Sequence, residues 1–155
     1  MRNRRGEGHI LTCVLVLAIG MVASVLMVFA TSISMVRYTK DNVALTLDSY
    51  VLEHAVEIYN AVKQGSNAIE EVDEGAYVAQ LRQFASLDQR GEFLYAYGSD
   101  GRLNYYMSVP RFQEGDHTLQ WEVSYTQYLP LRFMGEIVAY AQVPVTVTSV
   151  WTSKF

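Results

Sequence analysis

Residues 10–36 read ILTCVLVLAIGMVASVLMVFATSISMV, and no Lys, Arg, Asp, Glu or His interrupts them. This run of about 27 residues is longer than the roughly 20 that an α-helix needs to cross the hydrocarbon core of a bilayer. A cleaved secretory signal has a shorter apolar region of about 7–15 residues, and no A-x-A cleavage site closes this one. The run therefore predicts a single transmembrane helix, with the lipid bilayer as a partner.

Basic residues flank the apolar run on both sides. Arg2, Arg4 and Arg5 precede it, and Arg37 and Lys40 follow it. Because the cytoplasmic side of a span carries the excess of Lys and Arg, this bias predicts a cytoplasmic N-terminus in the cell membrane. The predicted parts are a basic cytoplasmic leader at residues 1–9, a transmembrane helix at 10–36 and an extracytoplasmic domain at 37–155.

The charge of the predicted domain limits its partners. The leader holds three of the 12 basic residues and one of the 16 acidic residues, which leaves 9 and 15, a net charge of −6, for the rest of the chain. An acidic domain argues against nucleic acid or anionic lipid as its partner. The only cysteine, Cys13, lies in the apolar run, so neither an intrachain disulfide nor a cysteine-based zinc cluster is expected.

The helix is predicted to continue beyond the membrane. No Pro or Gly occurs in residues 37–64, and apolar residues recur there at steps of three and four, while Thr46 falls on the opposite, polar face. We therefore expect one continuous helix over residues 10–64. A second helix is predicted at 74–88, because Asp73 is a suitable N-cap and Gly91 follows the segment.

The sequence pattern changes from helical to alternating after residue 91. Trp121 and Val123 alternate with polar residues, which predicts a half-buried strand with both side chains facing the helix, and Pro130 is expected to end it. The predicted strands lie at about residues 92–97, 102–109, 118–128 and 136–151. The fold class is therefore α+β, in which a long N-terminal helix packs against a small four-stranded antiparallel sheet.

The sequence shows no catalytic or metal-binding pattern. His9, His54 and His117 lie far apart and form no known ligand motif, and the acidic residues within 70–74 lack the spacing of a calcium loop. A solvated helix face or loop explains them better. We therefore expect a protein that is not an enzyme, with no catalytic residue, no cofactor and no metal ion.

Tyrosine is frequent, with 11 residues. Seven lie in the predicted sheet: Tyr95, Tyr97, Tyr105, Tyr106, Tyr125, Tyr128 and Tyr140. Aromatic residues favour strands, so most should be core residues or cross-strand pairs. A surplus of tyrosines on an outer face would form an interaction surface.

The order of these elements resembles a type IV pilin or pseudopilin. The start RRGEGHI (residues 4–10) is similar to pilin-like proteins of tight-adherence (Tad/Flp) systems, in particular the TadE-like group, and WEVSYTQYLPL (residues 121–131) is similar to a strand-Tyr-Pro segment near their C-terminus. The resemblance implies a pilin-like fold and a structural subunit of a pilus or secretion apparatus. Its partners would be other pilin-like subunits or that machinery, and it could reach a cell-surface fibre.

The resemblance also implies that a prepilin peptidase cuts after Gly6 and leaves Glu7 as the first mature residue. Pilins usually carry Glu at the fifth position after the cleaved Gly. Here that position holds Leu11, or Cys13 if the cut follows Gly8. This departure favours a minor pilin or an unprocessed relative over a major pilin.

Small residues in the apolar run would assist close packing between helices. Gly20 and Ser24 are four residues apart and Ala23 lies beside them, a spacing that allows helix backbones to approach. Two other functions remain open, a bitopic scaffold component of a secretion or conjugation channel and a membrane-anchored ligand-binding domain. A helix unbroken beyond the bilayer favours the pilin-like function, whereas a break within residues 37–40 favours the others.

Overall fold

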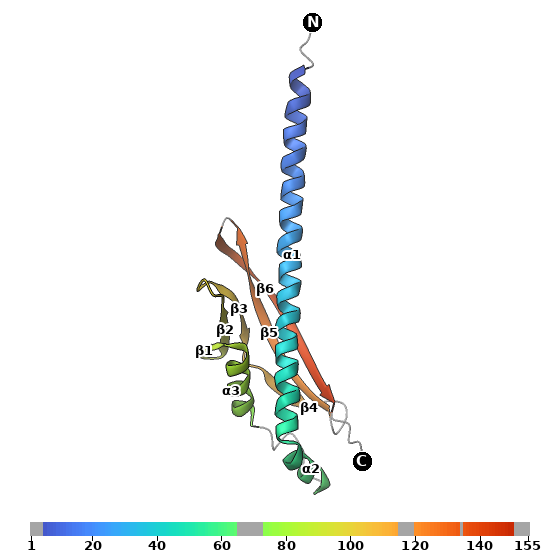
Figure 1. Cartoon of the computed structure of the whole chain (residues 1–155), viewed down its shortest axis with the longest axis vertical. Helices are drawn as coiled ribbons and strands as arrows, with labels where there is room; N and C mark the ends of the chain where they lie inside the picture. Colours follow the sequence, from blue (N-terminus) through green and yellow to red (C-terminus); the bar gives the residue numbers. More distant parts are fainter. Residues whose placement is uncertain (1–4, 65–72, 115–119, 134, 151–155) are drawn as a thin grey trace. The chain divides into compact units, whose positions relative to one another are not determined.

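The structure, a computed structural model, describes residues 5–64, 73–114, 120–133 and 135–150. It divides into two compact units, Met1–Met35 and Val36–Phe155, which we call the anchor unit and the domain unit (Figure 1). The fold class is α+β, with a long apolar N-terminal helix and a six-stranded antiparallel sheet.

Helix α1 (Arg5–Glu53) belongs to both units and contains the whole apolar run. It has no break at residues 36–42, but it ends at Glu53, and after a turn at His54 the helix α2 (Ala55–Lys63) begins. The expected single helix over residues 10–64 is therefore wrong at its C-terminal end. The His54 ring stacks on Tyr50 with centroids 4.3 Å apart, and its Nδ1 donates to the Tyr50 carbonyl at 3.0 Å. The backbone bonds continue across this turn, since the N–H of His54 donates to the Tyr50 carbonyl at 3.1 Å and that of Ile58 donates to the His54 carbonyl at 3.0 Å.

Helix α3 (Glu74–Ala85) begins as the sequence predicts. The Asp73 carboxylate accepts hydrogen bonds from the backbone N–H of Gly75 at 2.8 Å and of Ala76 at 3.2 Å, as an N-cap does. The predicted end at residue 88 is wrong, because Ser86 adopts a left-handed conformation with φ 52° and stops the helix. Residue 88 instead starts a strand.

The sheet has six strands rather than the predicted four. They are β1 (Asp88–Arg90), β2 (Phe93–Tyr97), β3 (Leu103–Ser108), β4 (Arg111–Glu114), β5 (Gln120–Phe133) and β6 (Glu136–Val150). Strand β5 pairs with β6 along one edge and with both β3 and β4 along the other. The additional strands are the short β1 and β4, and β4 is separated from β3 only by Val109 and Pro110.

Strand β5 continues through Pro130 to Phe133, so the prediction that this proline ends the strand is wrong. Proline is tolerated where a ladder needs no N–H from it. The β5–β3 register includes Tyr106↔Tyr128 and Met107↔Gln127, whereas Pro130 pairs only with Tyr140 of β6. The edge of β5 toward β3 is therefore free at this proline. The start of the predicted strand, residues 118–119, lies outside the described residues.

The core lies between the sheet and residues 36–53, which we call the domain half of α1. Trp121, Val123 and Tyr125 are buried, as their alternation predicts. On α1 the buried apolar residues are Val43, Leu47, Tyr50 and Val51. Thr46 was expected on the polar face, but it is buried and its hydroxyl donates to the Asn42 carbonyl at 2.8 Å. A threonine can occupy a helix interface when its hydroxyl is satisfied within the helix.

Buried hydrogen bonds fix the domain half of α1 to the rest of its unit. Gln127 of β5 donates from Nε2 to Thr39 Oγ1 at 3.0 Å, and the Tyr77 hydroxyl of α3 donates to the Val43 carbonyl at 3.2 Å. Because buried polar groups must find partners, these bonds select one register between helix, sheet and α3.

Candidate interaction surfaces

The first candidate surface is the apolar part of α1, residues 9–35. None of its large apolar side chains is buried, and α1 is the one helix among the described residues that is long and apolar enough to cross a membrane. The hydroxyls of Ser24, Thr31 and Ser32 donate to the carbonyl four residues earlier at 2.8–2.9 Å. These polar groups are satisfied within the helix, so lipid could surround them at little cost.

The predicted packing residues Gly20, Ala23 and Ser24 are exposed on this part of α1. A Cβ added at Gly20 would meet no atom within 4 Å, so the glycine leaves open space along the helix. Nothing in the described part of the chain therefore requires Gly20 to lack a side chain, and a second helix outside the chain could approach there.

The predicted cleavage residues lie at the start of the same helix. Because α1 begins at Arg5, Gly6 and Glu7 fall in its first turn. The sequence predicted the helix from residue 10, so the structure extends it toward the N-terminus. Cleavage after Gly6 remains a prediction, and it requires this first turn to open.

The second candidate surface is the outer face of the sheet. Five of the seven sheet tyrosines lie there without being buried: Tyr95, Tyr97, Tyr106, Tyr128 and Tyr140. They come from β2, β3, β5 and β6, and we call them the tyrosine face. The other two, Tyr105 and Tyr125, are buried on the opposite side. The tyrosines are thus divided between core and surface by the alternation of each strand.

The rings of the tyrosine face pack on one another. Tyr106 and Tyr128 are stacked, with centroids 4.6 Å apart and an interplanar angle of 4°, and Tyr95 stacks on Tyr106 at 5.3 Å. Arg90 lies 5.7 Å from the ring centroids of both Tyr95 and Tyr97. Because the ring faces stack on one another, the ring edges and hydroxyls are what a partner would meet. Such a surface suits a polar protein partner better than a sugar ring, which needs a free aromatic face to stack on.

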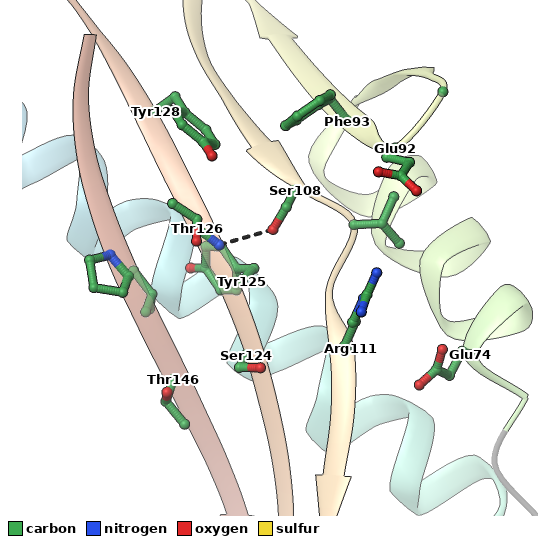
Figure 2. Close-up of a pocket in the computed structure, with 14 residues that line it drawn as sticks. Glu74, Glu92, Phe93, Ser108, Arg111, Ser124, Tyr125, Thr126, Tyr128 and Thr146 are labelled. Atoms are coloured by element: carbon green, nitrogen blue, oxygen red, sulfur yellow. Dashed lines mark hydrogen bonds between the residues drawn. The ribbon is translucent and has the colours of Figure 1, made fainter.

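The third candidate is an open groove of about 560 Å³ beside this face (Figure 2). It lies where the chain passes from β3 to β4, and there the Ser108 hydroxyl accepts a hydrogen bond from the Thr126 backbone N–H at 3.0 Å. Figure 2 shows the Arg111 side chain between the carboxylates of Glu92 and Glu74. The Glu74 carboxylate also accepts from the Phe112 backbone N–H at 3.2 Å. The groove thus has both polar and apolar walls, with charges of both signs.

The sequence reasoning missed this groove because it depends on the break between β3 and β4. Pro110 was the only local signal, since a proline between two strand-like segments can mark a bulge or an edge. Two of the acidic residues compared above with a calcium loop have structural partners, as Asp73 caps α3 and Glu74 accepts a hydrogen bond from Phe112. Glu70, Glu71 and His117 lie outside the described residues.

Within the part of the chain that the structure describes, no group of three or more His, Cys, Asp or Glu could hold a metal ion. Of the histidines there, His54 stacks on Tyr50 and His9 is exposed on α1. Comparison with protein-family models, curated proteins and solved structures finds no match to this chain.

Proposed function

We propose that this protein is a membrane-anchored, pilin-like structural subunit, of the minor pilin or pseudopilin kind, in a pilus or secretion apparatus. Its N-terminus would be cytoplasmic and its domain unit extracytoplasmic. The observation that carries the proposal is that α1 continues without a break from an apolar, unburied part into a half that is buried against an antiparallel sheet. One continuous helix would thereby join the membrane to the domain, as in pilins.

The mechanism follows from the exposed apolar surface of α1. In the bilayer this surface contacts lipid, and in an assembly the same surface would contact neighbouring helices. Lipid and leucine are similarly apolar, so the gain must come from close packing, which small residues allow. The open space at Gly20, together with Ala23 and Ser24, marks the face on which a neighbour would pack.

Cysteine crosslinking in native membranes tests this assembly. In a Cys13→Ser background, Ala23→Cys and Ser24→Cys place a thiol on the small-residue face. We expect oxidation to give crosslinked products with these two variants, when a neighbouring subunit carries a cysteine at the same depth.

Val22→Cys and Val25→Cys are the matched controls, because they place a thiol at a similar depth but on the opposite face of the helix. They should stay uncrosslinked. Equal crosslinking at all four positions, or none at any, would contradict assembly through this face.

Processing by a prepilin peptidase is tested separately. Cleavage after Gly6 would remove three arginines and leave Glu7 beside the new amine, a nearly neutral end that costs less to bury. Intact-mass measurement of protein from its native membrane should give a chain starting at Glu7, and Gly6→Leu should block the cut. A chain that starts at Met1 or Arg2 would indicate a permanent anchor and a role in the membrane platform.

The tyrosine face favours a second function, a membrane-anchored domain that binds a ligand or a scaffold partner. This function needs no contact between apolar helices. It would be supported if Tyr106→Ala and Tyr140→Ala abolished capture of a partner while crosslinking through Ala23→Cys was absent. Tyr59→Ala, on exposed α2, would be the control.

A further inference from the structure

The turn between β5 and β6 is apolar, which is unusual for a strand connection in water. Residues 129–143 read LPLRFMGEIVAYAQV, with Arg132 and Glu136 as the only charged residues. Turns are normally built from Gly, Asn, Asp, Ser and Pro because they are solvated. Here Phe133 and Met134 precede Gly135, so the sequence places large apolar residues at the end of the hairpin.

Neither face of β6 is covered next to this turn. Glu136 to Tyr140 are all exposed, although successive side chains of a strand point to opposite faces. Further along the same strand, Val145 and Val147 are buried. Val138 is 64% exposed and lies near the start of β6, at the irregularity between the pairs Leu131↔Ala139 and Arg132↔Ile137. This end of the hairpin therefore offers apolar side chains on both faces.

The same end of the hairpin is only two strands wide. The pairing of β5 with β3 reaches Tyr128, and beyond it β5 pairs only with β6 among the described residues. Figure 1 shows the β5–β6 hairpin extending past β2 and β3. An isolated two-stranded hairpin is marginally stable in water, so a further surface is needed to support it.

Two hydrogen bonds give the direction of the hairpin within the domain unit. Gln127 bonds to Thr39 at 3.0 Å, and Ser149, which pairs with Trp121, bonds to Asp48 at 2.6 Å. From Trp121 to Gln127, β5 thus runs from the level of Asp48 to that of Thr39, toward the first residue of the unit. After Gln127 the strand continues for roughly 20 Å in the same direction. The turn therefore lies at the end of the domain unit where α1 enters it.

We propose that this hairpin end lies in the headgroup layer of the bilayer, where Ile137, Val138 and Tyr140 contact lipid. The inference rests on the membrane anchoring of the proposed function, because α1 enters the domain unit directly after the apolar run. Tyrosine suits the membrane interface, where its ring is apolar and its hydroxyl is solvated. The Arg132 guanidinium donates from Nη2 to the Leu103 carbonyl at 2.8 Å, so part of its charge is satisfied within the sheet.

Two features limit the depth of insertion. The outer edge of β6 and the last residues of β5 carry unpaired backbone groups, which the hydrocarbon core does not tolerate. Arg132 and Glu136 have opposite charges, so zwitterionic lipid suffices and no anionic lipid is required. The hairpin would thus give the domain unit a second contact with the bilayer, which restricts its rotation about the anchor.

Lipid quenching of single fluorophores tests the proposal on the full chain. In a Cys13→Ser background, Val138→Cys and Val150→Cys are labelled with an environment-sensitive fluorophore and reconstituted in phosphatidylcholine vesicles. The two valines are a matched pair, since both lie on β6 and are 64% and 60% exposed. We expect headgroup-nitroxide lipid to quench the Val138→Cys probe several-fold more strongly than the Val150→Cys probe, and aqueous iodide to show the reverse.

Equal quenching of both probes by lipid would overturn the proposal. Protection of the Val138→Cys probe from iodide without lipid quenching would also overturn it, because a protein partner would then cover the hairpin. A third probe at Val25→Cys separates this failure from a failure of the anchor. Because Val25 lies near the middle of the apolar run, this probe is tested with lipid that carries the nitroxide deep in the acyl chain. If nitroxide lipid quenches the Val25→Cys probe but not the Val138→Cys probe, only the hairpin proposal is overturned. If it quenches neither probe, membrane anchoring through α1 and the hairpin contact are both overturned.

Discussion

The two parts of α1 are built from similar residues but differ in what covers them. In the apolar part Leu17 is 68% exposed, whereas in the domain half Leu47 is fully buried, with an exposed fraction of 0%. Hydroxyl residues differ in the same way, because Thr31 bonds only to its own helix at 2.8 Å, while Thr39 is bonded to Gln127 of the sheet at 3.0 Å. One helix therefore has two kinds of surface, one that is buried within the domain unit and one that is exposed among the described residues.

This difference in exposure indicates what stabilises each part of α1. The domain half is stabilised by burial against Trp121, Leu94 and other core residues of its own unit. The apolar part has no such burial among the described residues, and in the proposed function lipid or another helix would remove it from water. Substitutions in the two parts should therefore change different measurements.

The largest expected effect on stability comes from truncating Trp121 in the core of the domain unit. Trp121 is 2% exposed, so Trp121→Ala should lower the free energy of unfolding by about 3–5 kcal/mol through lost burial and a remaining cavity. Thermal unfolding of the full chain in detergent measures it. Phe84→Ala, at an exposed aromatic residue, should leave the melting temperature nearly unchanged. If Trp121→Ala melted at the wild-type temperature, the core would not lie where the structure places it.

The same substitution in each part of α1 tests the comparison directly. Leu47→Ala should cost about 2–5 kcal/mol, because the buried side chain leaves a cavity. Leu17→Ala removes an exposed side chain and should leave domain unfolding within about 0.5 kcal/mol of wild type. Chemical unfolding of both variants in the same detergent compares them. Equal losses would mean that the apolar part also has its partner within the chain.

Two threonines extend the comparison to polar contacts, Thr39 in the domain half and Thr31 in the apolar part. Thr39→Val leaves Gln127 Nε2 and the Tyr105 hydroxyl buried without their shared partner, so we expect a loss of about 1–3 kcal/mol. Thr31→Val removes only a hydroxyl bonded within its own helix and should be nearly neutral. Adding Gln127→Leu to Thr39→Val should recover part of the loss, because one unpaired group disappears. No recovery would show that the bond does not link helix and sheet.

The last prediction is a loss of folding stability at alkaline pH. Burial raises the pKa of Tyr77 and Tyr125 well above the ordinary value of about 10. The unfolded state ionises first, so stability is complete below about pH 10 and falls above it by roughly 1.4 kcal/mol per pH unit for each tyrosine. Urea unfolding from pH 8 to pH 11 measures this slope, and Tyr77→Phe should reduce it. A slope that Tyr77→Phe leaves at the wild-type value would contradict burial of Tyr77.

Much of the fold could be predicted because its signals are local. The uncharged run predicts the long helix, the alternation around Trp121 and Val123 gives the correct buried face, and Asp73 marks the start of α3. The errors occurred where another element decides the outcome. Pro130 continues a strand because, among the described residues, the edge of β5 toward β3 is unpaired at that point. A turn at the single residue His54 separates α1 from α2, although the backbone bonds across it are kept.

The candidate surfaces divide in the same way. The proposed packing residues Gly20, Ala23 and Ser24 and the proposed cleavage residues Gly6 and Glu7 could be named from residue type and spacing, and their roles stay predictions. The groove near Arg111 could not, since it depends on how β3, β4 and β5 pair.

The sequence by itself determined the anchor, the α+β class and the acidic character of the domain, because hydropathy, periodicity and charge are sums over neighbouring residues. Only the tertiary structure decided which tyrosines are core and which are surface. Tyr105 and Tyr106 are adjacent and chemically identical, yet the first is buried and the second stacks on Tyr128 at the outer face. The register of the strands against α1 assigns each one its side, and that register is set by contacts between residues far apart in the chain.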